Sequence, residues 1–358
     1  MRSQRFFDAH LDLAYLAEMG RDMLADPPDH PEHPAALTLK SLTQSHVQRA
    51  VATVFVQPRG LDSSGHMVDG PWCYSSPQEA YQQSLRQINW YHQWHNSGHL
   101  NLADSIDHES SQTLELLLLL EGAAGIRTLD DLTDFHRRGI RILALTWVNG
   151  TQWAGGDQSG GDVTTEGMKL LSRADELAMV HDVSHLSEQA FWTVMEKTSQ
   201  PKIASHSNCR SLLPGKQHPE RHLSDQQILA LANANGVIGI NLFSKFLVST
   251  GTAAISDVVR HIQHIVQLTG RTDIVGLGSD MDGGFSARDL PTGIRRPADL
   301  GKICDALATA NCFFPPAPAD WYAATTLAAP NTVMTSAPIS GDNFRMVSSG
   351  KSISRVRA

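Results

Sequence analysis

The feature that most constrains the fold is a regular alternation between short apolar segments and segments with helical periodicity. The apolar segments are rich in leucine and β-branched residues and have the length of strands. There are eight of them, at residues 6–13, 49–56, 114–120, 140–147, 179–184, 202–205, 236–242 and 273–279. Strands that alternate with helices favour a parallel sheet, and eight such units favour an α/β fold of the closed (β/α)8 TIM barrel type. An open doubly wound sheet is the alternative, but no Gly-x-Gly-x-x-Gly motif follows the first strand.

Helix-start signals between these strands support the alternation. Ser76 followed by Pro77 and Glu79 predicts a helix with a capping box, and Ser224 with Gln227 predicts a second one. We expect Ser256 to cap a later helix that Gly270 ends.

The whole chain, residues 1–358, is expected to form a single barrel domain with loop insertions. Within it, the barrel core is predicted to span about residues 5–312. Residues 313–340 are rich in proline and alanine and predict an extended excursion, and residues 341–358 predict a C-terminal tail.

Candidate metal ligands recur at the carboxyl ends of five predicted strands. They are His10, Asp12, Glu121, His185, His206 and Asp280. In a TIM barrel these strand ends share one rim, where the active sites of the fold lie. A single histidine at a strand end is more often satisfied by a hydrogen bond than by a metal. Three carboxylates buried together would be costly without cations, so the complete set predicts a metal centre.

The residue types indicate which metal the centre would take. Histidine and carboxylate ligands suit Zn²⁺, and six ligands exceed the three that a single catalytic zinc ordinarily takes from protein. Glu121 is the candidate to bridge two ions about 3.5–4 Å apart. A water between them would have its pKa lowered from about 15.7 toward about 7, which provides hydroxide at neutral pH. Asp280 is the candidate to accept and return a proton as that hydroxide attacks an amide.

Taken in order, five motifs resemble those of the renal (membrane) dipeptidase family, within the amidohydrolase superfamily. They are residues 8–13, 121–122, 182–185, 205–207 and 278–283, with a faint echo at 342–345. The resemblance extends over roughly residues 6 to 285. It implies a distorted TIM barrel, a binuclear zinc site, hydrolysis of dipeptides and often a homodimer.

The resemblance also implies a role for each ligand. His10 and Asp12 would bind one zinc, Glu121 would bridge, and His185 and His206 would bind the other. Asp280 would be the proton-transfer carboxylate on the first zinc.

The chain departs from the family at two substrate-binding positions. The family has a histidine after Leu-Thr at the end of the fourth strand, where this chain has Trp147, and an indole can donate one hydrogen bond but carries no charge. The family's Arg-Asn becomes Arg221-His222. Arg221 is expected to pair with a substrate carboxylate, the alternative being a surface arginine ahead of the Ser224 helix.

Composition narrows the partners and the compartment. The net charge is −8 and no basic block occurs, which argues against nucleic acid. The four cysteines form no Cys-x-x-Cys motif, and Cys209 is expected to be a buried thiol. Likewise, His181 is expected to be a core histidine. The longest apolar run, residues 116–120, is too short for a membrane span, and no apolar signal core follows Met1, so a cytoplasmic location is expected.

The leading hypothesis is therefore a zinc dipeptidase that cleaves dipeptides or related N-acyl amino acids. Trp147 keeps open a second reading, a non-catalytic or substrate-shifted metal-binding barrel of the same superfamily. A mononuclear deaminase or lactonase is a third. A small dipeptide-like substrate is the expected partner.

Overall fold

The fold was analysed in a computed structural model of the chain, which describes residues 6–61, 67–103 and 113–310. The predicted excursion at 313–340, the predicted tail at 341–358 and the motif echo at 342–345 lie outside these described residues.

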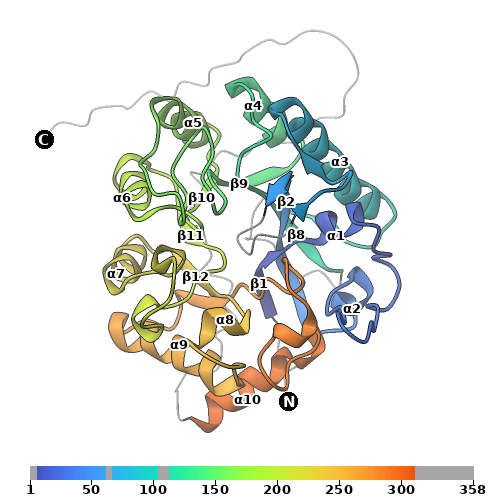
Figure 1. Cartoon of the computed structure of the whole chain (residues 1–358), viewed down its shortest axis with the longest axis vertical. Helices are drawn as coiled ribbons and strands as arrows, with labels where there is room; N and C mark the ends of the chain where they lie inside the picture. The colour runs from blue at the N-terminus through green and yellow to red at the C-terminus, as the bar shows by residue number, and fades with distance from the viewer. Residues whose placement is uncertain (1–5, 62–66, 104–112, 311–358) are drawn as a thin grey trace, which may run out of the picture. The chain divides into compact units, whose positions relative to one another are not determined.

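Eight parallel strands close into a barrel with helices outside it, which confirms the predicted (β/α)8 architecture (Figure 1). In sheet order, β2 is followed by β1, β13, β12, β11, β10, β9 and β8, and a β2–β8 pairing closes the ring. The strands are β1 (Phe6–Leu11), β2 (Val47–Phe55), β8 (Glu115–Glu121), β9 (Ile140–Ala144), β10 (Val180–Asp182), β11 (Lys202–Ala204), β12 (Val237–Ile240) and β13 (Val275–Leu277). Each overlaps one of the predicted apolar segments.

Short additional strands lie around the first half of the barrel. β7 (Asn101–Leu102) pairs with β8 at the edge of the main sheet. After β2, the chain forms β3 (Gln57–Pro58) and β4 (Gly60–Leu61), which pair with β6 (Cys73–Tyr74) and β5 (Met67–Val68). This excursion brings Tyr74 close to the end of β2.

Helices separate most of the barrel strands. They are α1 (Leu13–Glu18), α2 (Leu39–Thr43), α3 (Pro77–Asn96), α4 (Leu129–Arg137), α5 (Thr165–Glu176), α6 (Glu188–Lys197), α7 (Asp225–Asn233), α8 (Ser244–Leu247), α9 (Ile255–Thr269) and α10 (Gly301–Thr309). Within the described ranges, no helix combines the length and the apolar character needed to cross a bilayer.

The predicted helix caps are partly confirmed. The capping box of Ser224 and Gln227 is present at α7. At α3, Ser76 accepts a hydrogen bond from the Glu79 N–H, but the Glu79 carboxylate accepts from the N–H of Ser75, one residue further back than predicted.

The prediction that Ser256 caps α9 is wrong, because the N-cap is Ala254, two residues earlier. The Asp257 carboxylate accepts a hydrogen bond from the N–H of Ala254 at 2.8 Å and satisfies the helix start instead. Gly270 ends this helix as predicted, with a left-handed φ of 67°.

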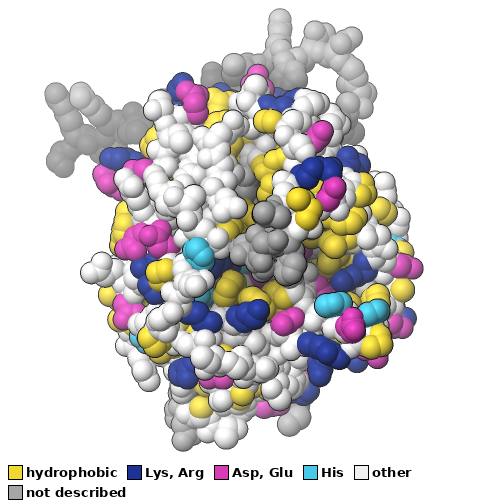
Figure 2. All heavy atoms as spheres, viewed as in Figure 1, with side chains coloured by type: hydrophobic (Ala, Val, Ile, Leu, Met, Phe, Trp, Pro, Cys, Tyr) yellow, Lys and Arg dark blue, Asp and Glu magenta, His cyan; other side chains and the backbone are white. Residues whose placement is uncertain are grey.

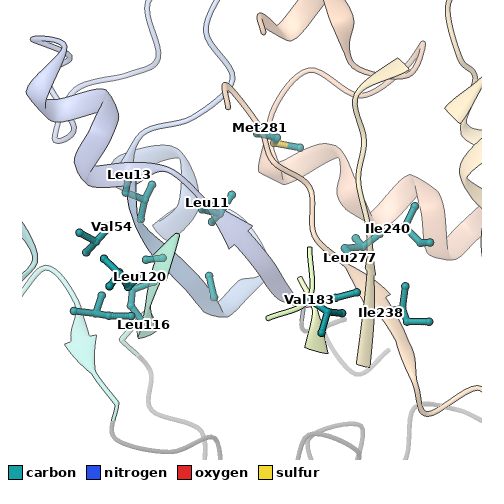
Figure 3. Packing of buried hydrophobic residues seen from close by; sticks show 14 of the residues in the cluster. Leu11, Leu13, Val54, Leu116, Leu120, Val183, Ile238, Ile240, Leu277 and Met281 are labelled. Atoms are coloured by element: carbon teal, nitrogen blue, oxygen red, sulfur yellow. The ribbon is translucent and has the colours of Figure 1, made fainter. Parts of the chain in front are cut away.

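The strand β8 divides two apolar layers and is buried along its whole length. Leu116, Leu118 and Leu120 join the large core between barrel and helices, whereas Leu117 and Leu119 join a smaller cluster with Val51. Figure 3 shows Leu116 and Leu120 packed beside Val54 of β2 in the large core. Burial on both sides explains why the segment reads as an unbroken apolar run.

Candidate metal centre

The six predicted ligands converge at one end of the barrel. His10 lies on β1 and Glu121 is the last residue of β8, whereas the others follow β1, β10, β11 and β13 in the next turns. Each of the six is at most 8% exposed. Two groups of ligand atoms each lie within 4.8 Å of one another, one from His10, Glu121 and His206 and one from His10, Asp12 and Asp280.

Glu121 is central to this cluster. Its Oε1 is 3.5 Å from Nε2 of His185 and 3.7 Å from Nε2 of His206. Its other oxygen, Oε2, is 3.4 Å from Nε2 of His10, which is in turn 3.9 Å from Asp12 Oδ1. The two oxygens of one carboxylate therefore face different histidines, which is the geometry that a bridging ligand needs.

Left-handed turns aim two of these ligands into the barrel mouth. His185 lies three residues beyond the end of β10 with a φ of 63°, and Asp280 follows β13 with a φ of 57°. A positive φ is uncommon for residues other than glycine and is concentrated at functional sites. Asp282 has the same conformation, and its carboxylate accepts hydrogen bonds from the N–H groups of Ala36 and Leu37, which anchors this turn.

Ser205 determines which ring nitrogen is protonated in two of the histidines. Its hydroxyl donates to Asp182 Oδ2 at 2.6 Å, so its oxygen is left to accept from Nδ1 of His10 at 3.0 Å and from Nδ1 of His206 at 2.8 Å. A neutral imidazole has one protonated nitrogen, so a proton at Nδ1 leaves Nε2 as a lone pair. In their neutral forms, both histidines therefore direct an Nε2 lone pair toward Glu121.

Asp157 does the same for the third histidine. Its Oδ2 lies 2.8 Å from Nδ1 of His185, and an ionised carboxylate has no proton to donate, so it accepts a hydrogen bond from Nδ1. The Nε2 atoms of His185 and His206 then face each other at 3.0 Å beside Glu121, with no proton donor between them. Three imidazole lone pairs directed at one carboxylate must be compensated by protons or by a metal cation, and this nitrogen and oxygen donor set fits zinc.

The pKa shifts of His10 and Asp280 also indicate that this cluster carries an excess of negative charge. Burial lowers the pKa of His10, but the facing carboxylates of Glu121, Asp12 and Asp280 outweigh it and raise the pKa to about 10. Burial, together with the charges of Asp12 and Glu121, raises the pKa of Asp280 to about 8. Without a metal, the cluster would therefore hold protons that a divalent cation can replace.

Comparison with known families shows which family the chain belongs to. A model of the family described as membrane dipeptidase (peptidase family M19) matches residues 1–311. The chain belongs to the membrane dipeptidase family. This confirms the resemblance found in the sequence motifs, and it supports a metal-dependent peptidase.

Individual relatives and solved structures agree with the family. A Klebsiella pneumoniae protein described as uncharacterized, in the pqqA 5′ region, is 33% identical over 58% of this chain and 78% of its own. Human dipeptidase 3 is 28% identical over 59% of this chain and 44% of its own. Among solved structures, a metallo peptidase from Rhodobacter sphaeroides superposes with a TM-score of 0.75 at 21% identity, covering 90% of this chain and 99% of that one. At that identity the match supports the fold.

The two predicted substrate-binding residues follow different barrel strands, Trp147 after β9 and Arg221 after β11. The Trp147 ring is 6.2 Å from that of His185 and 5.1 Å from that of Phe55, at the mouth after β9. Arg221 is only 6% exposed, so it is no surface arginine. Two of its nitrogens already donate, one to the His206 carbonyl oxygen at 2.9 Å and one to Ser207 Oγ at 3.2 Å.

The sequence reading missed the residues that orient the ligands. Asp157 lies in a glycine-rich loop with no pattern that would single it out. Asn241, which follows β12, donates from Nδ2 to Asp280 Oδ2 at 2.8 Å. Asp182 and Ser205 do lie within the family motifs, which was the available signal.

The other two predictions concern the core. His181 is buried and paired with Asp175 at 2.7 Å, and Cys209 is a fully buried thiol, as expected for both.

Proposed function

We propose that the chain is a zinc-dependent dipeptidase, which hydrolyses the amide bond of a dipeptide or of a closely related N-acyl amino acid. The observation that carries the proposal is the Glu121 carboxylate, whose two oxygens face His10 on one side and His185 with His206 on the other. His10, Asp12 and Asp280 would hold one ion, Glu121 would bridge, and His185 and His206 would hold the second. Two zinc ions bound there would polarise the scissile carbonyl and supply hydroxide at neutral pH.

Asp280 is the residue proposed to move the proton. Asn241 donates to its Oδ2, and the Asn241 amide is itself held because its Oδ1 accepts from the Phe243 N–H at 2.7 Å. This leaves Oδ1 of Asp280 to take a proton from the attacking water and return it to the leaving amine.

Arg221 is proposed to bind the substrate carboxylate through its remaining nitrogen. Its Nε is buried and has no hydrogen-bond partner among the described residues, and the nearest carboxylate oxygen, Asp157 Oδ2, is 3.9 Å away. A buried guanidinium with an unsatisfied donor favours an anionic ligand. The Rhodobacter sphaeroides structure contains a phosphinate mimic of the dipeptide L-Ala-D-Ala, which is a ligand of the class proposed here.

The test is turnover of a dipeptide panel by zinc-loaded protein, including substrates with a C-terminal D-residue and N-acyl amino acids. We expect hydrolysis that a chelator abolishes and zinc restores, with two zinc ions per chain by elemental analysis. Asp280→Asn should lower kcat by about 10²–10⁴-fold, since the amide cannot accept the proton. The exposed Asp305→Asn is the matched control. A folded, zinc-replete protein that cleaves nothing in the panel would refute the proposal.

Trp147 favours a second candidate, a barrel that binds metal without dipeptidase activity. An indole cannot stabilise a developing oxyanion as a charged imidazole can. Trp147→His distinguishes the two: turnover that appears only in this variant would support the non-catalytic reading. One metal ion per chain would instead point to a mononuclear hydrolase.

A further inference from the structure

A recess opens directly beside Glu121, where β2, β8 and β9 end. It has an empty volume of about 310 Å³, which includes open solvent. Its walls include Phe55, Pro58, Tyr74 and Trp147, and Glu121 forms its inner end. In the space-filling view, hydrophobic side chains gather on this face near the middle, toward β2 and α3 (Figure 2).

The lining of the recess is largely aromatic and apolar, with Asn149 and Thr151 as its uncharged polar side chains besides Tyr74. Of the described residues that line it, Glu121 alone carries a charge, and that carboxylate is already directed at the three histidines. The rings of Phe55 and Trp147 lie 5.1 Å apart at 54° and form a continuous aromatic surface. Burial raises the pKa of Tyr74, so its phenol is neutral throughout the physiological range. Such a surface favours apolar groups and disfavours charged ones.

The recess is pre-formed, because its aromatic walls are held from behind. Gln87 of α3 accepts from the Phe55 N–H at 3.0 Å and donates back to the Phe55 carbonyl oxygen. The Trp147 carbonyl oxygen accepts from the N–H of Gly150 at 2.8 Å, which closes the turn after β9. Walls that are fixed before binding lose little conformational freedom when a ligand enters.

The position of the recess determines which part of a dipeptide could enter it. Its walls follow β2, β8 and β9, whereas Arg221 is bonded to His206 and Ser207, which follow β11. Counted round the closed ring from β11, the strands β9, β8 and β2 are the second, third and fourth, and the fourth is the strand opposite β11. A substrate with its carboxylate on Arg221 and its amide at the centre would direct its N-terminal residue toward the recess.

We propose that the recess binds an apolar side chain, aliphatic or aromatic, of the residue on the N-terminal side of the scissile amide. This inference rests on the proposed dipeptidase function, because it uses Arg221 and the metal centre to orient the substrate. Trp147 is then a specificity-determining residue, and its indole in place of an imidazole makes the recess apolar.

The experiment compares kcat/KM of the zinc-loaded protein for Leu-Ala, Phe-Ala, Asp-Ala and Lys-Ala, which differ only at the N-terminal residue. We expect the apolar substrates to be preferred by about ten-fold or more, as for an apolar pocket that selects by side-chain contact. Trp147→Ala should reduce this preference at least about five-fold, whereas Trp147→Phe should retain most of it. Trp192→Ala, at an indole that is 37% exposed on α6, is the control and should leave the preference unchanged.

The possible outcomes separate the two proposals. Hydrolysis of all four substrates with equal kcat/KM would overturn the recess assignment and leave the dipeptidase proposal standing. A preference for apolar substrates that survives in Trp147→Ala, with the same circular dichroism spectrum as the parent, would overturn the role of Trp147. Failure to hydrolyse any dipeptide would overturn the proposed function, and the recess assignment with it.

Discussion

Replacing Gly283 by alanine should disable the metal centre although it replaces none of the candidate ligands. A Cβ atom at this position would lie 1.9 Å from Asp280 Oδ1 and 2.9 Å from Asp12 Oδ2. The first distance is shorter than ordinary contact by about 1.5 Å, so the Asp280 carboxylate has to move by a comparable amount. Gly283 is not among the glycines with a positive φ, so backbone strain does not explain the effect.

A displacement of this size predicts a large loss of activity. Misplacing a catalytic group by about 1 Å can lower the rate about 10²-fold, and we expect at least that loss in kcat/KM for Gly283→Ala. Zinc content should also fall, because Asp12 and Asp280 are the proposed ligands of one ion. The assays are steady-state hydrolysis of a dipeptide and elemental analysis of the dialysed protein.

Gly276→Ala is the matched control for this prediction. Gly276 lies on β13, the strand before Asp280, and a Cβ atom there would meet nothing within 4 Å. This variant should keep its activity and both zinc ions. Full activity and full zinc content in Gly283→Ala would refute the proposed positions of the two carboxylates.

Two further predictions concern carboxylates outside the ligand set. Asp157→Asn should weaken zinc binding by about 10–100-fold, because His185 loses its carboxylate partner. The affinity can be measured by competition with a chromophoric chelator, with the exposed Asp162→Asn as the control. An affinity equal to that of the control would contradict this role of Asp157. For Asp175, burial raises the pKa, but hydrogen bonds from His181 and Ser199 outweigh it and lower the pKa from 3.8 to about 2. The ionised form therefore stabilises the fold fully above about pH 4, and that contribution is lost as the pH falls toward about 2. Urea denaturation should accordingly show Asp175→Asn less stable by about 1–2 kcal/mol at pH 7 and the difference shrinking below pH 4, whereas a pH-independent difference would contradict the assignment.

The barrel could be predicted because buried parallel strands have a recognisable hydrophobic pattern in the sequence. A strand such as β8, buried on both faces, cannot tolerate polar residues in its interior and so appears as an unbroken apolar run. Helix starts were less certain, because several residues near a start can satisfy the same N–H groups. At α9, Asp257 does this from inside the helix, which misled the prediction from Ser256.

The candidate ligands could be listed from sequence, but their orientation could not. His185 lies three residues beyond its strand, and only its left-handed φ of 63° aims it at Glu121. The contacts that fix its proton are made by Asp157, which is 28 residues earlier in the chain. Such contacts depend on how two loops meet in space, and neither periodicity nor a strand-end position encodes them.

The barrel mouth has two parts, the candidate metal centre and the aromatic recess, and different interactions constrain their residue types. This difference explains why the sequence predicted the metal centre and not the recess. The metal centre brings together buried carboxylates and imidazoles, whose charges must be compensated, so the residue types themselves report the chemistry. The recess is constrained by shape and apolar contact, which many side chains can provide. The Trp147 ring lies 6.2 Å from that of His185, whose Nδ1 keeps its contact with Asp157 at 2.8 Å. On the proposal made above, an indole at position 147 would change which substrates enter, while all six candidate ligands are present.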